Sequence, residues 1–150
     1  MNDRQHARLI DLKDVCARMQ QAWKIDALVD IRIVPSIKRG RFVGMATVWN
    51  DGRSGVRIEI RNRLTRERQI WILAHELRHI MQRQSGALRT VGGRDTWHGA
   101  AVDESAMPYN DLPWEKDANA WADQHASAFY GNEVRVSTGG RSLFDIPWGR

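Results

Sequence analysis

One stretch, residues 70–84, constrains this chain more than any other. Apolar residues recur there at three- and four-residue steps, at positions 70, 73, 74, 77, 80 and 81, which is the pattern of an amphipathic helix. No proline or glycine lies between positions 65 and 84 to interrupt such a helix. The stretch contains an H-E-x-x-H motif, His75-Glu76-Leu77-Arg78-His79. A helix places the two histidines of this motif one turn apart on one face.

Two imidazoles at this spacing can share one zinc ion, and Glu76 beside them can act as a general base toward water at the metal. The alternative is a chance match, in which His75 and His79 are ordinary surface or core residues. At the His and Glu frequencies of this chain, a chance match is expected in roughly 1 of 100 such sequences. We therefore predict a zinc site on this helix, provided that another part of the chain supplies a third ligand.

Length and composition predict one domain over residues 1–150. The chain has 150 residues and is 42% hydrophobic, which is enough for one modest core. Cys16 is the single cysteine, so neither an internal disulfide nor a cysteine zinc site is expected. Residues 1–20 have no apolar core typical of a signal peptide, and no run of 18 apolar residues predicts a membrane span. We expect a cytoplasmic protein without membrane contact; the oligomeric state stays open.

The net charge of +5 is concentrated in one segment. Residues 38–68 contain nine basic and three acidic side chains, a balance of +6. This segment could bind nucleic acid or an acidic protein. The alternative is a solvated arginine-rich surface, which we favour because no known nucleic-acid motif accompanies the charges. The basic residues are Lys38, Arg39, Arg41, Arg53, Arg57, Arg61, Arg63, Arg66 and Arg68.

Before the motif, the sequence predicts one helix and three strands. Residues 4–24 have the periodicity of an amphipathic helix whose apolar side includes Cys16, which we expect to be buried and unreactive. Residues 29–33, 42–49 and 56–60 have strand character, with turns at 38–41 and 50–55. Connections this short predict a small sheet of three or more strands, antiparallel or mixed, on which the motif helix packs; we expect it to be mostly antiparallel.

After the motif, the sequence predicts a hairpin and a further helix. Thr65 is the expected N-cap of the motif helix, and Gly86 marks its end. Residues 88–91 and 96–102 can pair across a turn at 92–95. Residues 114–130 have helical periodicity. Residues 131–150 are expected to be an extended tail whose Phe144, Ile146 and Trp148 dock on the body.

The third zinc ligand must come from the acidic and histidine residues that follow His79. Glu115 stands out among them, because it opens the last helix and is followed one turn later by Ala118 and Asn119. The other candidates are His98, Asp103, Glu104, Asp111, Asp117, Asp123 and His125.

H-E-x-x-H followed by E-x-x-A-N on a second helix resembles the gluzincin peptidases. The form with an aromatic residue and alanine after the asparagine looks most like the ImmA/IrrE-type metallopeptidases of bacteria and their prophages, and Trp97-x-Gly99 and Pro113-Trp114-Glu115 are similar to small phage-encoded HExxH peptidases. The resemblance covers residues 65–130. It implies a zincin-like α+β fold and zinc ligands His75, His79 and Glu115. Many gluzincins have an acid at the position of Asn119, where it hydrogen-bonds a zinc-binding histidine.

His98 is the rival third ligand. SprT-like proteases, which act on proteins bound to DNA, use a third histidine after HExxH that is often followed by glycine, as in His98-Gly99. Their spacing is shorter than the gap between His79 and His98, so we favour Glu115. His98, Tyr109 and His125 are candidate donors to the developing oxyanion; His125 is also expected to be simply packed, since it lies on the apolar side of its helix.

These observations predict a zinc metallopeptidase that hydrolyses peptide bonds of a specific protein, with Glu76 as the general base. In zincins an edge strand near the metal pairs with the extended substrate, and we expect the strand at 56–60 to run beside the motif helix. Arg57 could favour acidic substrate side chains. The alternative function is a zinc-containing binding module that uses the basic segment. Glu76 favours the enzyme, because a structural zinc site needs no general base.

Overall fold

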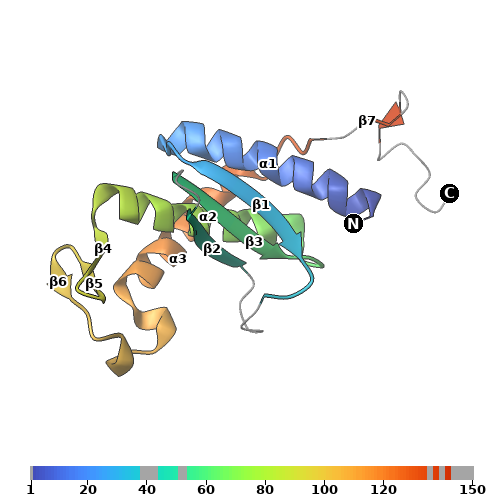
Figure 1. Cartoon of the computed structure of the whole chain (residues 1–150). Coiled ribbons are helices and arrows are strands. Elements are labelled where there is room, and N and C mark those ends of the chain that lie inside the picture. Colours follow the sequence, from blue (N-terminus) through green and yellow to red (C-terminus); the bar gives the residue numbers. More distant parts are fainter. Residues whose placement is uncertain (1, 38–43, 51–53, 135–136, 139–140, 143–150) are drawn as a thin grey trace.

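The computed structural model describes residues 2–37, 44–50, 54–134, 137–138 and 141–142. Long helices and small sheets occur together, so the chain belongs to the α+β class as predicted (Figure 1). The elements up to the motif helix are α1 (Asp3–Trp23), β1 (Leu28–Val34), β2 (Gly44–Asn50), β3 (Ser54–Arg61) and α2 (Arg66–Ser85). They are followed by β4 (Leu88–Val91), β5 (Arg94–Trp97), β6 (Ala100–Ala101), η1 (Glu104–Ala106), η2 (Tyr109–Asp111), α3 (Pro113–His125), η3 (Ala126–Phe129), β7 (Ser137–Thr138) and β8 (Arg141–Ser142).

Helix α1 forms where its periodicity predicts. Asn2 and Gln5 cap its start reciprocally, each side chain accepting a hydrogen bond from the other residue's backbone N–H. Its apolar side is buried against the rest of the core, and Cys16 lies on that side. Burial raises the pKa of the Cys16 thiol to about 12, so this thiol stays protonated and unreactive at neutral pH.

The main sheet is mixed rather than mostly antiparallel. Its strand order is β1-β3-β2, with β1 parallel and β2 antiparallel to β3. Ile31 of β1 lies beside Ile58 of β3, and both side chains are buried. The mixed sheet is one of the two alternatives that the sequence left open, but one of its two pairings is parallel, so the sheet is not mostly antiparallel. Alternation shows which face of a strand is buried, not which strand is its partner. A connection over residues 35–43 is also longer than a tight hairpin turn and does not force β1 and β2 together; its predicted turn at 38–41 lies outside the described residues.

Helix α2 packs against elements that precede it and follow it in the chain. Thr65 caps its start by accepting a hydrogen bond from the Arg68 N–H at 3.1 Å, and Gly86 ends it at φ 80°, a left-handed conformation that glycine adopts without strain. Both predictions at the ends of this helix are confirmed. The helix contacts β2, β3, α1 and α3, and in Figure 1 it passes behind the strands. Its buried residues include Ile70, Leu73 and Leu77.

The hairpin after α2 has three short strands where the sequence predicted two. Strands β4, β5 and β6 are antiparallel neighbours, and the predicted strand at 96–102 is broken by a turn at His98 and Gly99. These two residues have φ values of 49° and 83°, which end β5 and reverse the chain. The hairpin closes over a small second core of Leu88, Leu112 and Trp114.

The last part of the chain is helical only to Phe129. Helix α3 begins at Pro113, a residue favoured in the first helical turn, and continues into η3, in agreement with the helix predicted over 114–130. Part of the predicted tail forms a small hairpin of β7 and β8. Phe144, Ile146 and Trp148, for which docking was expected, lie outside the described residues.

A buried ion pair joins α1, α2 and the segment after η3. The Arg66 guanidinium donates from Nε to Asp11 Oδ2 at 2.7 Å and from Nη2 to Asp11 Oδ1 at 3.1 Å. The Val134 N–H donates to Asp11 Oδ1 at 3.0 Å, and Arg66 Nη1 donates to the Tyr130 carbonyl. Asp11 is 1% exposed and Arg66 7%, so both charges are compensated inside the protein.

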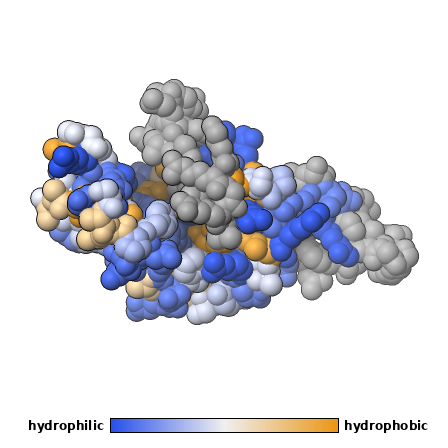
Figure 2. Space-filling model, turned by 90° about the horizontal axis from the view of Figure 1, so that it is seen from below, coloured by the Kyte–Doolittle hydropathy of each residue, from blue (hydrophilic) through white to orange (hydrophobic). Residues whose placement is uncertain are grey.

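Few large hydrophobic side chains are exposed in the described part of the chain. On the face shown in Figure 2, most of the surface drawn in colour is hydrophilic. Among the described residues, the large hydrophobic side chains that are exposed are Leu28, Val91, Met107 and Tyr109. Within the same ranges, no helix is both long enough and apolar enough to cross a membrane.

Candidate metal centre

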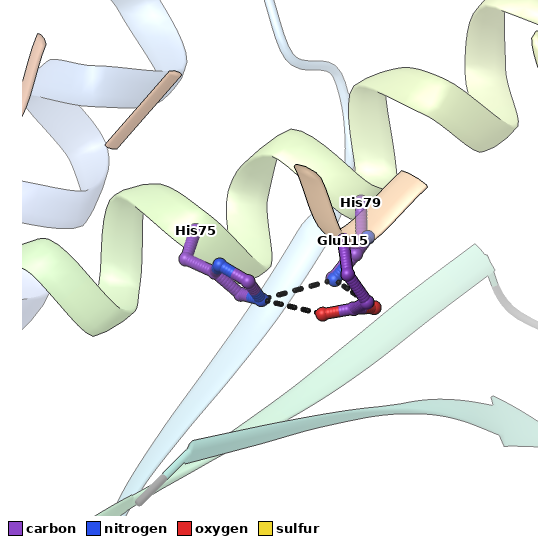
Figure 3. A group of neighbouring side chains, drawn as sticks. All are labelled: His75, His79 and Glu115. Carbon is purple, nitrogen blue, oxygen red and sulfur yellow. Dashed lines mark hydrogen bonds and ion pairs between the residues drawn. The ribbon is translucent and has the colours of Figure 1, made fainter. Parts of the chain in front are cut away.

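Three side chains from two helices converge on one point (Figure 3). His75 and His79 of α2 approach each other with their Nε2 atoms 3.1 Å apart. Glu115 of α3 reaches both, with Oε1 at 3.1 Å from His75 Nε2 and Oε2 at 3.0 Å from His79 Nε2. The structure thus brings together the three residues that the sequence nominated as metal ligands.

The local sequence explains why these side chains meet. The four-residue spacing on α2 puts both imidazoles on one helical face. On α3, Trp114, Ala118 and Ala122 are buried, so this side of the helix packs inward and carries Glu115 toward α2, which α3 contacts. Glu115 lies in the first turn of α3, where the helix dipole favours a carboxylate.

The charges of the cluster stabilise one another. Burial raises the pKa of the Glu115 carboxyl, but the hydrogen bonds and the positive charges of His75 and His79 together outweigh burial and lower this pKa to about 2. Burial lowers the pKa of His79, whereas its hydrogen bond with Glu115 and the charges of Glu76 and Glu115 raise it, and the net shift is upward. The site is therefore a preformed environment for positive charge.

The donor set fits a zinc ion. Zinc prefers imidazole nitrogen and carboxylate oxygen at about 2.0–2.2 Å, and a tetrahedral arrangement then separates neighbouring donors by about 3.3 Å. The separations of 3.0 and 3.1 Å given above are close to this value. Two imidazole nitrogens and a carboxylate oxygen directed at one point form a cation site with three protein ligands, which leaves a fourth position for water or substrate.

Gln82 holds His79 from the side opposite the cluster. Its Oε1 lies 2.8 Å from His79 Nδ1, while its Nε2 donates to the Trp114 carbonyl at 2.9 Å and to Asp117 Oδ2 at 2.8 Å. Gln82 was not among the residues predicted for the site; the gluzincin resemblance instead pointed to the position of Asn119 for a hydrogen bond to a zinc-binding histidine. Within the described part of the chain, no hydrogen bond joins Asn119 to either histidine. The pattern that could have indicated Gln82 is its position one turn after His79 on the same helical face.

Trp71 covers the other histidine. Its ring stacks on His75 at 5.4 Å between centroids and 27° between planes, and its Nε1–H donates to Asp123 of α3 at 2.8 Å. The Arg68 guanidinium lies over the Trp71 ring, 4.7 Å from its centroid. Within the described residues, the buried Nδ1 of His75 has no hydrogen-bond partner. Away from Glu115, the His75 ring is therefore held by stacking on Trp71, whereas the His79 ring is held by a hydrogen bond at Nδ1.

The remaining nominated residues lie in different environments. Glu76 is buried, and its charge acts on His79. His98 is exposed in the turn after β5, against Trp97, and is not part of the three-residue cluster. Tyr109 is half exposed in η2; its role at the oxyanion stays a prediction. His125 packs against Trp121 and Trp23, which agrees with its expected role in packing.

Some of the described basic residues of segment 38–68 form ion pairs within the protein. Arg66 is buried in the ion pair with Asp11, and Arg57 pairs with Asp30 at 3.3 Å. Lys38, Arg39, Arg41 and Arg53 lie outside the described residues. The described part of this segment therefore gives the nucleic-acid interpretation no additional support.

No protein-family model matches the chain, and neither the curated proteins nor the solved structures contain a significant match to it. The function must therefore be argued from the site itself.

The coupling between Glu115 and its histidines predicts how the metal-free protein responds to pH. The lowered pKa of Glu115 gives stability above its ordinary value of 4.5, which is lost as the pH falls toward about 2. The raised pKa of His79 gives stability below its ordinary value of 6.5, which is lost as the pH rises through the folded-state pKa. We therefore expect the free energy of unfolding of the wild type to exceed that of Glu115→Gln by about 1.5–3 kcal/mol, the range for hydrogen bonds to charged groups. Urea unfolding in the presence of a chelator measures this difference.

That difference should be largest between pH 4.5 and 6.5 and should shrink on both sides. A difference that stays constant from acid to alkaline pH would contradict this account of the cluster.

Proposed function

We propose that this protein is a zinc-dependent metallopeptidase in which His75, His79 and Glu115 hold the metal. The observation that supports the proposal is the convergence of these three donors from two helices, beside the buried Glu76 of the same motif. A structural zinc site would need no acid at that position. The gluzincin-like motif pair, the zincin-like arrangement of an HExxH helix and a third-ligand helix, and the ImmA/IrrE resemblance belong to the same proposal.

The residues have separate tasks in peptide hydrolysis. A zinc ion held by these residues would supply Lewis acidity toward the attacking water and the substrate carbonyl. Glu76 takes the proton of the attacking water on its carboxylate and passes it to the leaving amine. His75, His79 and Glu115 would hold the ion between α2 and α3, which pack against each other. Tyr109 and His98 remain candidates for hydrogen bonding to the developing oxyanion.

Strand β2 offers the best place for an extended substrate. It pairs only with β3 among the described residues, so its other edge can accept a further strand. Strand β3, which the sequence placed beside the motif helix, is the central strand and has no such edge. Because α2 also contacts β2, a peptide added there would run along the side of the sheet nearest to the motif helix. We therefore propose a protein segment in extended conformation as the substrate.

Glu76→Gln tests the enzyme directly. The amide is isosteric with the carboxylate but cannot accept the proton of water, so hydrolysis should fall by about 10²–10⁴-fold while zinc content stays at one ion per chain. The measurement is mass-spectrometric mapping of new N-termini in a cytoplasmic extract treated with wild type or variant. The substrate then follows from the new ends that only the wild type forms.

Glu67→Gln is the matched control, because Glu67 is an exposed glutamate on the same helix. It should produce the same new N-termini as the wild type. If the zinc-loaded wild type forms no new ends that are absent with Glu76→Gln, in extracts or with a random peptide library, the peptidase proposal is wrong.

A further inference from the structure

We infer that Gln82 is the residue that positions His79 for the metal: it fixes the orientation and tautomer of the imidazole and aligns it with Glu115. This inference rests on the proposed function, because it concerns how the chain prepares the zinc site. It assigns a role to a residue that lies outside the HExxH motif and is not itself a ligand.

The contact between Gln82 and His79 is buried. Gln82 follows His79 by three residues on α2 and is 2% exposed. Its Oε1 lies 2.8 Å from His79 Nδ1, on the far side of the ring from the cluster. A buried amide that makes this contact cannot exchange it for water without leaving its place, so the contact restrains the imidazole ring.

The orientation of the Gln82 amide is determined by its other partners. Its Nε2 lies 2.9 Å from the Trp114 carbonyl oxygen and 2.8 Å from Asp117 Oδ2. A carbonyl oxygen and a carboxylate can only accept hydrogen bonds, so the NH₂ group must face them. Arg78 donates to the same carboxylate at 2.8 Å from Nε to Oδ2 and 3.3 Å from Nη2 to Oδ1, which keeps Asp117 charged and in place.

The amide orientation fixes the tautomer of His79. With NH₂ directed at Trp114 and Asp117, the amide oxygen faces His79 Nδ1 and can only accept. Nδ1 must therefore carry the proton, and the lone pair of the neutral ring is on Nε2, the atom that points into the cluster. This is the tautomer that a metal at Nε2 requires.

Gln82 also aligns the two helices of the site. Trp114 and Asp117 flank Glu115 on α3, one residue before it and two residues after it. One side chain of α2 thus bonds to His79 and to both sides of the segment that supplies the third donor. A shift of α3 along α2 would disrupt these hydrogen bonds together with the contacts of Glu115.

Gln82→Met removes every one of these hydrogen bonds and keeps the length of the side chain. We expect the zinc dissociation constant, measured by competition with a chromophoric chelator, to rise about 10–100-fold, the usual effect of losing a hydrogen-bond partner of a metal-binding histidine. In the zinc-loaded protein, the NMR resonance of the His79 Nδ1 proton should also lose its protection from exchange with water.

Gln69→Met is the matched control. Gln69 is another glutamine of α2, is also 2% exposed, accepts from Arg8 at 2.7 Å and donates to the Arg61 carbonyl at 3.0 Å. Its replacement removes a comparable buried network that does not touch the cluster. It should lower stability toward urea but leave zinc affinity and the His79 proton unchanged.

Gln82→Glu separates positioning from general stability. A glutamate keeps an acceptor for His79 Nδ1–H but loses both donors and places a second carboxylate beside Asp117. It should therefore be less stable than Gln82→Met and yet bind zinc more tightly than Gln82→Met does. If zinc affinity instead follows stability across the three variants, or if Gln82→Met binds zinc as tightly as Gln69→Met, the inference is wrong.

The two proposals fail in different ways. A wild type that binds zinc but cleaves nothing overturns the peptidase function and leaves the role of Gln82 to be decided by zinc affinity. A wild type that binds no zinc overturns both. Wild-type zinc affinity in Gln82→Met, with an active enzyme, overturns only the inference about Gln82.

Discussion

Glu115→Ala should remove zinc from the protein under conditions in which the wild type retains one ion per chain. The variant keeps His75 and His79 on α2 but loses the carboxylate that lies 3.1 and 3.0 Å from their Nε2 atoms. Loss of a direct ligand should weaken binding by more than the roughly 10–100-fold expected for an outer hydrogen-bond partner. Metal analysis after dialysis against a weak chelator measures the effect, and any zinc-dependent hydrolysis should disappear with the ion.

His98→Ala is the appropriate comparison for this variant, because His98 is the rival third ligand in the sequence. It is exposed in the turn after β5 and lies outside the cluster. The variant should retain zinc like the wild type. If zinc is lost from His98→Ala and kept by Glu115→Ala, the ligand assignment is wrong and the SprT-like arrangement replaces it.

Asp11→Ala should destabilise the fold strongly, although Asp11 lies outside the metal centre. It leaves the buried Arg66 guanidinium without its counter-ion and the Val134 N–H without its acceptor. Breaking a buried pair by removing one partner costs about 3–5 kcal/mol. Urea unfolding at fixed zinc concentration measures the loss, and the transition should move to markedly lower denaturant.

Asp14→Ala provides the control on the same helix. Asp14 pairs with Arg18 at 3.0 Å, but both side chains are substantially exposed, so the cost should be only about 0–1 kcal/mol. Combining Asp11→Leu with Arg66→Met should cost less than Asp11→Ala alone, because no buried charge is then left uncompensated. If Asp11→Ala and Asp14→Ala lower the free energy of unfolding equally, the buried pair contributes no more to stability than the exposed pair.

The sequence was sufficient for features that depend on local pattern. The helical period around His75 and His79, the cap at Thr65, the stop at Gly86 and the start of the last helix near Pro113 are encoded within one or two turns of chain. Glu115 could be nominated for the same reason, because its position in a first helical turn is local information.

Features that depend on which elements meet could not be predicted in the same way. The parallel pairing of β1 with β3 reflects a choice of partner that strand alternation does not encode. Its spacing from His79 makes Gln82 a possible partner of that histidine, but the partners that orient its amide, Trp114 and Asp117, come from α3. Asp11 likewise meets Arg66 and Val134 from distant parts of the chain. From sequence alone, a glutamine or an aspartate on a helix is expected to be exposed, because burial of such a side chain depends on partners from other elements.

The division of the cluster between two helices connects metal binding to local opening of the structure. Helix α3 has 13 residues, a length that is marginal for an isolated helix in water, so its order depends on docking against α2. A local opening that undocks α3 withdraws Glu115 and leaves both histidines on α2, which reduces three donors to two. Because an ion that binds only the docked state opposes this opening by mass action, occupancy of the site and hydrogen-exchange protection of α3 are two readouts of the same equilibrium.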